Sequence, residues 1–350
     1  MSDSPSKPLV LVTGASGFIA GHCVNELMEN GYSVRGTVRS LKNEKKVAHL
    51  RELAAKHGTE IDLVEADLSS DLGWSEAVDG CTYVLHVASP FPSEQPDDEN
   101  DLIRPAVDGA RRVLEACAAT KGAVQRVVLT SSVAAVSYGS TPSNGKAFTE
   151  EDWSTIDKCD AYPKSKTLAE REAWKIVEGL PDDEKFELAV INPGFVAGPL
   201  LSPNCGTSGE VLRRLMSRGL PACPELGWAL VDVRDVALAH RLAMETPKAA
   251  GNRYIAAGAH MWMQELGKIL AEEFNPKGFK VPTGKLPYWV LWIGARFDKT
   301  LKLALAFIGH REDISAEKAN TELGWTPRPA RDTVIDMGYS LIEHGIVAEP

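Results

Sequence analysis

The chain has 350 residues, of which 44% are hydrophobic and 25% charged, and this length allows a large core and a second lobe. Its formal net charge of −10 argues against a nucleic-acid-binding surface, because such a surface needs a basic patch and only short basic clusters occur. The most apolar late stretch, LPYWVLWIGARFDKTLKLALAFIG, is broken by Arg296, Asp298 and Lys299. No run therefore reaches the roughly 20 residues that span a bilayer, and we expect no stable membrane insertion.

The first half of the chain alternates predicted strands and helices. Residues 9–13, LVLVT, are a buried-strand run that stops at a glycine turn. From Phe18 onward apolar residues recur every four positions, which predicts a helix that ends at Asn30-Gly31. Five further strands are predicted, with helical segments between most of them, at residues 32–38, 61–66, 82–88, 124–132 and 186–193.

This alternation predicts an α/β protein, with a Rossmann-type, doubly wound parallel sheet that is covered on both faces. The second half is less regular. Residues 199–209 are loop-like, whereas residues 231–245 have the pattern of another sheet-packing helix. Residues from about 255 to 330 are rich in proline, tryptophan and short helical segments.

We therefore expect two domains. Residues 1–196 form the Rossmann domain, to which residues 231–254 return. Residues 197–230 and 255–350 form a smaller, mainly C-terminal lobe for the substrate, together with the C-terminal tail. Five aromatic residues of this lobe favour an apolar pocket: Trp228, Trp262, Tyr288, Trp289 and Trp292.

The thiols and the first residues predict the compartment. The N-terminal residues MSDSPSKP have no apolar core of signal-peptide length. The six cysteines are scattered, without Cys-x-x-Cys pairs or histidine clusters nearby. We therefore expect free thiols in a reducing cytoplasm and no metal site.

The turn TGASGFIA places Gly14 and Gly17 between the first strand and the first helix. Glycines let a backbone approach a pyrophosphate closely, and the N-terminus of the helix offers N–H groups and a positive dipole end. The context of a strand before and a helix after predicts a dinucleotide site. The residues expected to hold the cofactor here are Gly14, Ser16, Gly17, Phe18 and Ile19.

The end of the second strand indicates which dinucleotide is bound. NAD-binding proteins usually have an acidic residue there for the ribose 2′-hydroxyl. In this chain Val38 holds that position, Arg39 follows, and Lys45 and Lys46 come shortly after. Cations suit a 2′-phosphate, so the sequence favours NADPH and NADP+. Asp67, just after the third strand, is placed to accept from the adenine amino group.

Tyr162 and Lys166 lie four residues apart at the start of a predicted helix, and therefore on one helix face. The Lys166 ammonium would stabilise a Tyr162 phenolate and bring its pKa towards the working range. Tyr162 could then protonate the oxygen of a carbonyl that receives a hydride. A serine at the end of the fifth strand would hold that oxygen. Of Ser131 and Ser132, we choose the more C-terminal one.

The chain resembles the extended short-chain dehydrogenase/reductase family, most closely its dihydroflavonol reductase and cinnamoyl-CoA reductase branch. The matching motifs occur in the same order: VTGASGFIA, YSVRGTVR, the Lys45-Lys46 pair, EADL, GCTYVLHVASP, LTSS, YPKSKTLAE, NPGFVAGP and EKANTELGWTPRP. The resemblance implies reduction of a small carbonyl substrate, with Ser132, Tyr162 and Lys166 as the triad. Family members occur as monomers or homodimers.

The same resemblance assigns the cofactor contacts. It implies that Arg39 and Lys46 hold the 2′-phosphate and that Asp67 and Leu68 hold the adenine. It further implies that Val87 and Ser89 flank the ribose. The residues from Pro193 to Val196 would contact the nicotinamide end.

Two departures from the branch leave the substrate open. Cinnamoyl-CoA reductases carry an Asn-Trp-Tyr-Cys-Tyr run that ends in the catalytic tyrosine, whereas this chain has KCDAY. Plant dihydroflavonol reductases usually have an asparagine five residues after the catalytic serine, where this chain has Ser137. The alternatives on the same fold are a hydroxysteroid dehydrogenase and an NAD-dependent sugar-nucleotide epimerase. A third is a sensor that binds NADPH without turning it over.

Overall fold

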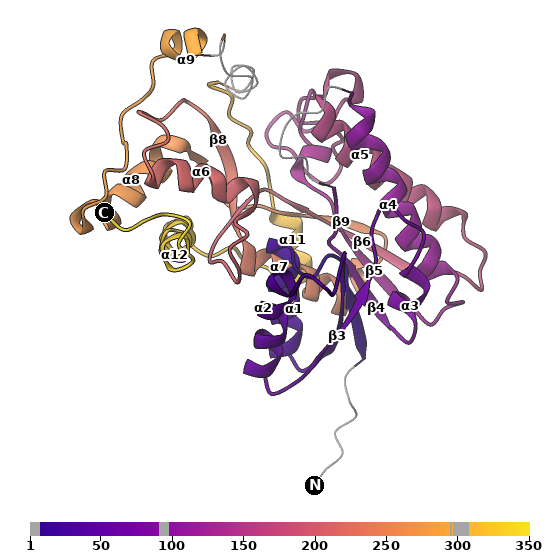
Figure 1. Cartoon of the computed structure of the whole chain (residues 1–350). Coiled ribbons are helices and arrows are strands. Elements are labelled where there is room, and N and C mark those ends of the chain that lie inside the picture. Colours follow the sequence, from indigo (N-terminus) through magenta and orange to yellow (C-terminus); the bar gives the residue numbers. More distant parts are fainter. Residues whose placement is uncertain (1–7, 91–97, 295, 297–307) are drawn as a thin grey trace. The chain divides into compact units, whose positions relative to one another are not determined.

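The computed structural model describes residues 8–90, 98–294, 296 and 308–350. The chain divides into two compact units. The first comprises Met1–Pro193, Arg234–Ala256 and Ser315–Thr326, and the second comprises Gly194–Val233, Ala257–Ile314 and Pro327–Pro350. Figure 1 identifies the elements along the chain by colour and label.

The first unit is built on a seven-stranded sheet, in the order β3-β2-β1-β4-β5-β6-β9, in which every neighbouring pair is parallel. Its strands are β1 (Leu9–Val12), β2 (Ser33–Val38), β3 (Ile61–Glu65), β4 (Tyr83–His86), β5 (Arg126–Thr130), β6 (Glu187–Pro193) and β9 (Asn252–Ala256). Its helices are α1 (Phe18–Glu29), α2 (Glu44–Lys56), α3 (Trp74–Val78), α4 (Asn100–Ala118), η1 (Val133–Ala135), η2 (Ile156–Lys158), α5 (Ala161–Gly179), α7 (Val233–Glu245), η3 (Pro247–Ala249) and α11 (Glu317–Leu323).

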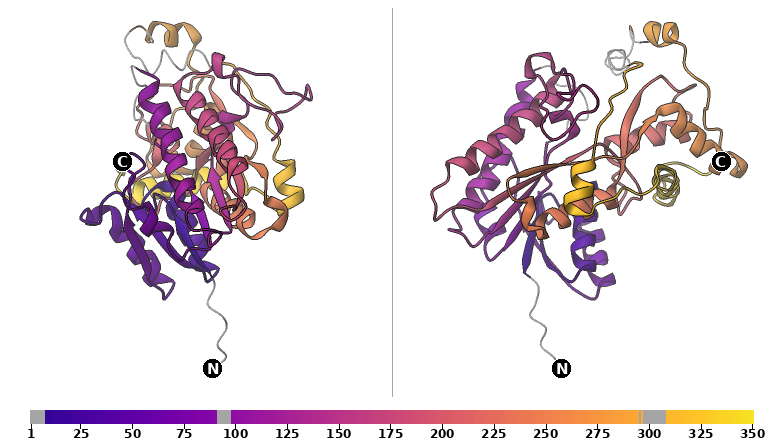
Figure 2. Two further views of the ribbon diagram at one scale, coloured as in Figure 1. Left: turned by 90° about the vertical axis from the view of Figure 1, so that its right-hand side faces the viewer. Right: turned by 180° about the vertical axis from the view of Figure 1, so that it is seen from behind.

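Helices cover both faces of this sheet, as Figures 1 and 2 show for the first unit. On one face α4 and α5 pack along each other, and their buried Val113, Leu114 and Ala173 join the strands in one apolar core. On the other face α1 and α7 are tied together by an ion pair of 2.7 Å between Arg241 Nε and Glu26 Oε1. The sheet is apolar because both of its faces are buried, which is the rule for parallel sheets.

The expected Rossmann-type, doubly wound sheet is therefore confirmed, and all six predicted strands are present. The chain runs from β3 at the edge of the sheet back to β4 beside β1, so the strand order reverses between β1 and β4. In open α/β sheets ligands bind at the carboxyl ends of the strands at such a reversal. The seventh strand, β9, was not expected.

The second unit contains a three-stranded sheet in the order β10-β8-β7, in which β10 is antiparallel to β8 and β7 is parallel to it. This sheet was not expected. The elements of the unit are β7 (Phe195–Ala197), α6 (Gly206–Met216), β8 (Gly227–Asp232), β10 (His260–Trp262), α8 (Met263–Phe274), η4 (Asn275–Lys277), α9 (Tyr288–Gly294) and α12 (Ala330–Glu343).

Several predicted boundaries need correction. The predicted loop 199–209 ends in helix, because α6 begins at Gly206. The helix predicted over 231–245 begins at Val233, since the two residues before it close β8. Of the helices expected in the apolar stretch 286–309, α9 lies in the described part, whereas residues 295 and 297–307 lie outside it.

Residues 315–326, which we assigned to the lobe and tail, belong to the first unit instead. The reason is that α11 is fastened to β9 and η3. Glu322 accepts a hydrogen bond of 2.9 Å from the Tyr254 hydroxyl and pairs with Lys248 Nζ at 3.0 Å. Lys318 Nζ donates to Asn252 Oδ1 at 2.9 Å.

None of the helices in the described part of the chain combines the length and apolarity that a bilayer crossing requires.

Candidate active site

The turn after β1 has a backbone conformation that favours glycine at position 14. Gly14 has a φ of +64°, and a Cβ added there would lie 3.0 Å from the Ala88 Cβ. Its N–H donates to the Thr37 hydroxyl at 2.9 Å. The turn is thus fastened to β2 and lies close to the segment that follows β4. A side chain at position 14 would meet both strain and a close contact.

The ends of β1 and β4 are joined by a buried hydrogen bond of 2.9 Å between Thr13 Oγ1 and His86 Nδ1. The same hydroxyl accepts from the Ala88 N–H at 2.9 Å. Burial, with the charge of Lys166 as a smaller cause, lowers the pKa of His86 to about 3. His86 is therefore a neutral structural residue at neutral pH.

The start of α1 fits a cofactor phosphate. Gly17 is the N-cap residue and provides no side-chain hydrogen bond to the first turn, which contains no acidic residue. The positive dipole end of this 12-residue helix is thus neither capped by a side chain nor opposed by a carboxylate. Ser16, Phe18 and Ile19 are half-buried around the turn.

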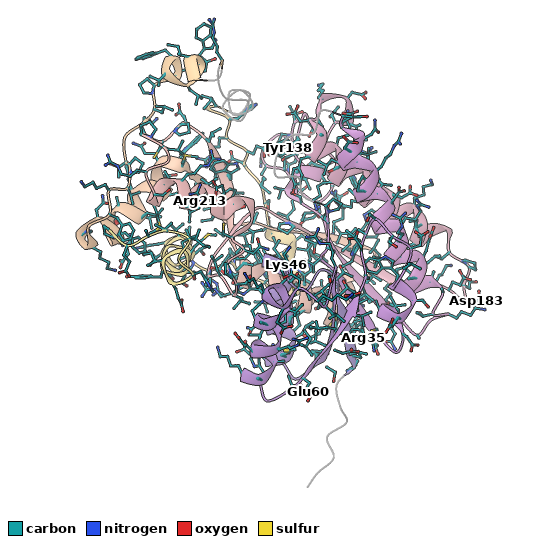
Figure 3. All side chains as sticks on the ribbon, viewed as in Figure 1. Arg35, Lys46, Glu60, Tyr138, Asp183 and Arg213 are labelled. Atoms are coloured by element: carbon teal, nitrogen blue, oxygen red, sulfur yellow. The ribbon has the colours of Figure 1, made fainter. Side chains whose placement is uncertain are left out.

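The expected 2′-phosphate residues lie at the end of β2 and the start of α2. Arg39 follows β2 directly and is exposed. Lys45 and Lys46 lie exposed in the first turn of α2, and Figure 3 labels Lys46. Side-chain and backbone hydrogen bonds from Ser69, and to a lesser degree the charge of Arg39, lower the pKa of Asp67. The Asp67 carboxylate and the Arg39 guanidinium are thus close enough to interact electrostatically beside the carboxyl end of β3.

Four other expected cofactor contacts occupy different positions. Leu68 packs against α4, where a Cβ added to Gly109 would lie 2.9 Å from the Leu68 Cβ. Val87 follows β4 and is half-buried, and Pro193 is buried at the end of β6. Val196 lies in β7, which belongs to the second unit.

Tyr162 and Lys166 lie one turn apart near the start of α5. Asp160 is the N-cap residue, and Pro163 is accommodated because a first turn does not use its missing N–H. The Lys166 Nζ atom lies 5.9 Å from the centre of the Tyr162 ring and donates a hydrogen bond of 3.0 Å to the Ser89 hydroxyl. Tyr162 is half-buried and Lys166 is buried.

Ser132 rather than Ser131 faces the tyrosine. The pKa of Tyr162 is raised, because burial outweighs the lowering effect of a hydrogen bond with the Ser132 side chain. The expectation that Lys166 brings this pKa down is therefore wrong for the protein without its cofactor. The Ser131 hydroxyl instead donates to the buried carboxylate of Glu170, at 2.5 Å from Oε2. Adjacent serines at the end of β5 thus point to different partners. Ser132, Tyr162 and Lys166 are the side chains brought together.

The ionisation of Lys166 is sensitive to its surroundings. Burial lowers the pKa of this ammonium to about 8, and the carboxylate of Glu170 acts in the opposite direction. A protonated Lys166 beside Tyr162 favours the phenolate, which is what a tyrosine proton donor requires after it has lost its proton.

A buried polar cluster that the sequence does not indicate lies next to Ser132 and Lys166; it is formed by Glu170, Asn192 and Arg253. Arg253 Nε pairs with Glu170 Oε1 at 2.5 Å, and Asn192 Nδ2 donates to Glu170 Oε2 at 2.9 Å. Glu170 could have been found, because it follows Lys166 by four residues and therefore shares its helix face. Arg253 could not, because its strand was not predicted.

The aromatic residues expected to line a substrate pocket differ in their surroundings within the second unit. Trp228 stacks on Phe195 with ring centres 4.7 Å apart, and Trp262 contacts His260 edge to face at 4.7 Å. The other three are exposed on α9, with exposed fractions of 58% for Tyr288, 65% for Trp289 and 46% for Trp292. Among the described residues no group of three His, Cys, Asp or Glu could hold a metal ion.

The chain is similar to a known family and to several known reductases. Residues 10–257 match the model of the NAD dependent epimerase/dehydratase family. The cinnamoyl-CoA reductase CAD2 of Medicago truncatula is 40% identical over 278 residues, which cover 78% of this chain and 82% of that protein. An anthocyanidin reductase of Vitis vinifera is 35% identical over 292 residues, covering 79% and 83%. The yeast methylglyoxal/isovaleraldehyde reductase Gre2 in complex with NADPH superposes with a TM-score of 0.78 at 31% identity, covering 97% of this chain and all of the other.

Proposed function

The chain belongs to the NAD dependent epimerase/dehydratase family, and we propose that Tyr162 is its proton donor in the NADPH-dependent reduction of an aldehyde or ketone to the alcohol. The protein is an oxidoreductase that uses NADPH, as the matching relatives and the NADPH-bound neighbour indicate. Two contacts support this role of Tyr162: its hydroxyl is hydrogen-bonded with the Ser132 side chain, and Lys166 Nζ lies 5.9 Å from the centre of its ring.

The residues of the site divide the reaction between them. When bound, NADPH supplies a hydride to the carbonyl carbon. The Ser132 hydroxyl holds the carbonyl oxygen, and Tyr162 transfers its phenolic proton to that oxygen as negative charge develops there. The O–H bond of Tyr162 breaks, a new O–H bond forms on the product alcohol, and the phenolate that is left lies beside Lys166. The Ser89 hydroxyl fixes the Lys166 ammonium in place.

The proposed cofactor contacts follow the same sheet edge. We assign the pyrophosphate to the glycine turn and the start of α1, and the 2′-phosphate to Arg39 with Lys45 and Lys46. Asp67 and Leu68 are assigned to the adenine, Val87 and Ser89 to the ribose. The segment from Pro193 to Val196 is assigned to the nicotinamide end.

The substrate we propose is a fairly apolar carbonyl compound of small size. Ser137, at the position where plant dihydroflavonol reductases usually carry an asparagine, is buried and donates to the Val133 carbonyl at 3.2 Å. Its hydroxyl thus has a backbone partner within the fold. This supports a substrate that is held by shape and apolar contact more than by an amide at that position.

The test is the oxidation of NADPH at 340 nm with a panel of carbonyl compounds, repeated with NADH. The panel holds aromatic aldehydes, α-keto esters, diketones, a dihydroflavonol and a 3-ketosteroid. We expect turnover with NADPH well above that with NADH. Turnover confined to the 3-ketosteroid would favour a hydroxysteroid dehydrogenase. Tight NADPH binding without any turnover would contradict the proposal and favour a sensor.

A cytoplasmic location and a monomeric or homodimeric state complete the proposal. Cell fractionation tests the location. Sedimentation of the purified protein with and without NADPH tests the state of assembly.

A further inference from the structure

A single buried carboxylate connects three strands behind the proposed triad. The side chain of Glu170 has an exposed fraction of 0% and comes from α5. It accepts hydrogen bonds from Ser131 at the end of β5, at 2.5 Å, and from Asn192 in β6, at 2.9 Å. From β9 it pairs with the Arg253 guanidinium, whose Nε atom lies 2.5 Å from Oε1. A buried ion is tolerated only with such a full set of partners.

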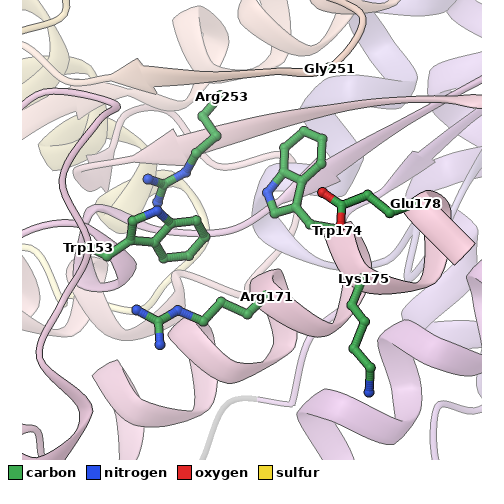
Figure 4. A pocket seen from close by; sticks show the side chains of 7 residues that line it. All are labelled: Trp153, Arg171, Trp174, Lys175, Glu178, Gly251 and Arg253. Carbon is green, nitrogen blue, oxygen red and sulfur yellow. The ribbon is translucent and has the colours of Figure 1, made fainter.

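Arg253 is itself held rigidly. Its Nη1 atom donates to the carbonyl oxygens of Glu150, at 2.9 Å, and Asp152, at 2.8 Å. Its guanidinium lies over the Trp153 ring, 3.7 Å from the ring centre, and Figure 4 shows Arg171 on the other side of that ring. Arg253, Trp153 and Arg171 are among the residues that line a cavity of about 400 Å³ on the surface of the first unit. Arg253, the ion-pair partner of Glu170, is therefore held in place by contacts that do not involve Glu170.

The Glu170 carboxylate influences both groups that act on Tyr162, Lys166 and Ser132. Along α5 it lies one turn beyond Lys166, and its charge acts on that ammonium. Along the strand ends it fixes Ser131, the neighbour of Ser132. Asn192 Nδ2, which donates to Glu170, also donates to the Ser132 carbonyl at 3.1 Å. The positions of the serine and the charge of the lysine thus depend on one group.

We propose that Glu170 is a positioning residue for the reduction: its carboxylate fixes Ser132 through Ser131 and Asn192 and keeps a negative charge beside the Lys166 ammonium. This rests on the proposed function of the site. Glu170 acts through Ser132 and Lys166, and through them on the proton that Tyr162 transfers.

The charges around Lys166 determine the pH dependence. From its own helix Tyr162 and Glu170 face it, and from β4 and the residues after it His86 and Ser89 do so. His86 is neutral because burial depresses its pKa. Arg253, on β9, opposes part of the negative charge of Glu170. Loss of the Glu170 charge therefore lets Lys166 lose its proton at a lower pH.

The experiment compares Glu170→Gln with Glu172→Gln in the full-length enzyme. Gln keeps nearly the shape of Glu but removes the charge. Glu172 lies on the same helix, half-buried, and pairs with Lys175 at 3.5 Å, so its variant removes one charge without touching the cluster. For each variant we would measure kcat/KM against pH with the best carbonyl substrate of the panel. The pH dependence of NADPH binding, followed by cofactor fluorescence, gives a readout that needs no turnover.

We expect Glu170→Gln to lower kcat by about 10- to 100-fold, because Gln has one acceptor oxygen where Glu170 uses two. It cannot accept from Arg253 on one side and from Ser131 and Asn192 on the other, so the strand ends around Ser132 shift. We expect the alkaline limb of kcat/KM and of NADPH binding to move about one pH unit lower. Glu172→Gln should leave both profiles unchanged. A Glu170→Gln profile that superposes on the wild type, or an equal shift in Glu172→Gln, would overturn the proposal.

Glu170→Asp distinguishes the effect of the negative charge from the effect of side-chain length. It also keeps the test decisive if Glu170→Gln does not fold. Asp keeps the negative charge near Lys166 but is too short to hold Ser131 at the same distance. The alkaline limb should therefore stay at the pH of the wild type while kcat falls. A shifted limb in this variant would contradict the role of the charge. If the wild type reduces no carbonyl of the panel, the proposed function fails, and the binding profile still tests Glu170.

Discussion

Lys166 Nζ donates a hydrogen bond of 3.0 Å to the Ser89 hydroxyl, and this contact joins α5 to the segment that follows β4. The two residues are 77 positions apart in the chain. The lysine that faces Tyr162 is thereby bound to a residue expected at the cofactor ribose. One ammonium can therefore serve the proton donor and the cofactor together.

The first prediction concerns Tyr162→Phe. Removal of the phenolic hydroxyl removes the proton donor but leaves the ring and its packing, so turnover should fall by about 10²- to 10⁴-fold. NADPH binding, measured by cofactor fluorescence, should stay within about twofold of the wild type. Tyr32→Phe is the matched control, because it removes a hydroxyl that donates to Glu245 Oε1 at 2.8 Å, far along the chain from the triad. An unchanged rate in Tyr162→Phe would refute the assignment of the triad.

The second prediction concerns the choice of cofactor. Arg39→Ala should weaken NADPH binding about tenfold, because a charge-assisted contact to a 2′-phosphate is lost and 1.4 kcal/mol corresponds to about a factor of ten. NADH has no 2′-phosphate, so its binding should stay the same. Lys56→Ala, in the last turn of α2, is a charge-matched control. Equal losses for NADPH and NADH would place Arg39 outside the 2′-phosphate site.

The sequence predicts the sheet well where strands are near-continuous apolar runs. β1 and β6 are of this kind, with the apolar runs LVLV and LAVI, which are buried except for the half-buried Leu9. The strand β9, NRYIA, was missed because it carries Asn252 and the buried Arg253. The charge of Arg253 is compatible with burial only because Glu170 lies opposite, 83 positions away, and no local pattern contains that fact. The strands β7 and β10 have three residues each, too few for a periodic pattern.

The same distinction applies to the site. The glycine turn and the Tyr162–Lys166 pair are local motifs, and the spacing of their residues along the chain determines how they lie relative to one another. The sequence could therefore indicate them. The choice of Ser132 over Ser131 follows from the order of the two serines and from the resemblance. The physical reason, that Ser131 donates to Glu170 instead, requires the fold. Asn192 belongs to the same cluster, at the end of a strand whose pattern indicates only an apolar core.

The third prediction separates strain from close contact at the glycines. Gly14→Ala places a Cβ at positive φ and 3.0 Å from the Ala88 Cβ, so it should lower the free energy of unfolding by more than the roughly 1–2 kcal/mol of left-handed strain alone. It should also weaken NADPH binding, because the turn must shift. The measurements are urea unfolding and cofactor fluorescence.

Two further variants isolate each cause. Gly58 has a φ of +66°, and an added Cβ would meet nothing within 4 Å among the described atoms, so Gly58→Ala should cost the strain alone and leave NADPH binding intact. Gly36 is not at positive φ, but its added Cβ would lie 2.7 Å from the Ala15 Cβ. Gly36→Ala should therefore lower the free energy of unfolding through the close contact alone, and it should disturb the glycine turn that contains Ala15. Equal costs in Gly14→Ala and Gly58→Ala would show that the Ala88 contact contributes nothing.

The last prediction is that the free energy of unfolding falls on acidification because of two buried histidines. Burial lowers the pKa of His86 to about 3 and that of His240 to about 4, whereas both rings bind protons near pH 6.5 in the unfolded chain. Between pH 6.5 and about 4 the unfolded state therefore binds more protons, so stability rises with pH and is lost as pH falls through this window. Each ring contributes up to about 1.4 kcal/mol per pH unit.

His240→Asn tests this slope for one ring. His240 Nε2 lies 2.6 Å from Thr130 Oγ1 and Nδ1 lies 2.7 Å from the Val236 carbonyl oxygen, so the variant will be less stable at pH 7.5. Its free energy of unfolding should nevertheless fall less steeply on acidification than that of the wild type. The slopes should differ by the equivalent of about one proton taken up on unfolding, since the carboxylates titrate alike in both proteins. His310→Gln, at an exposed position, should keep the slope of the wild type. Parallel acid limbs in His240→Asn and the wild type would mean that the His240 ring takes up its proton without unfolding.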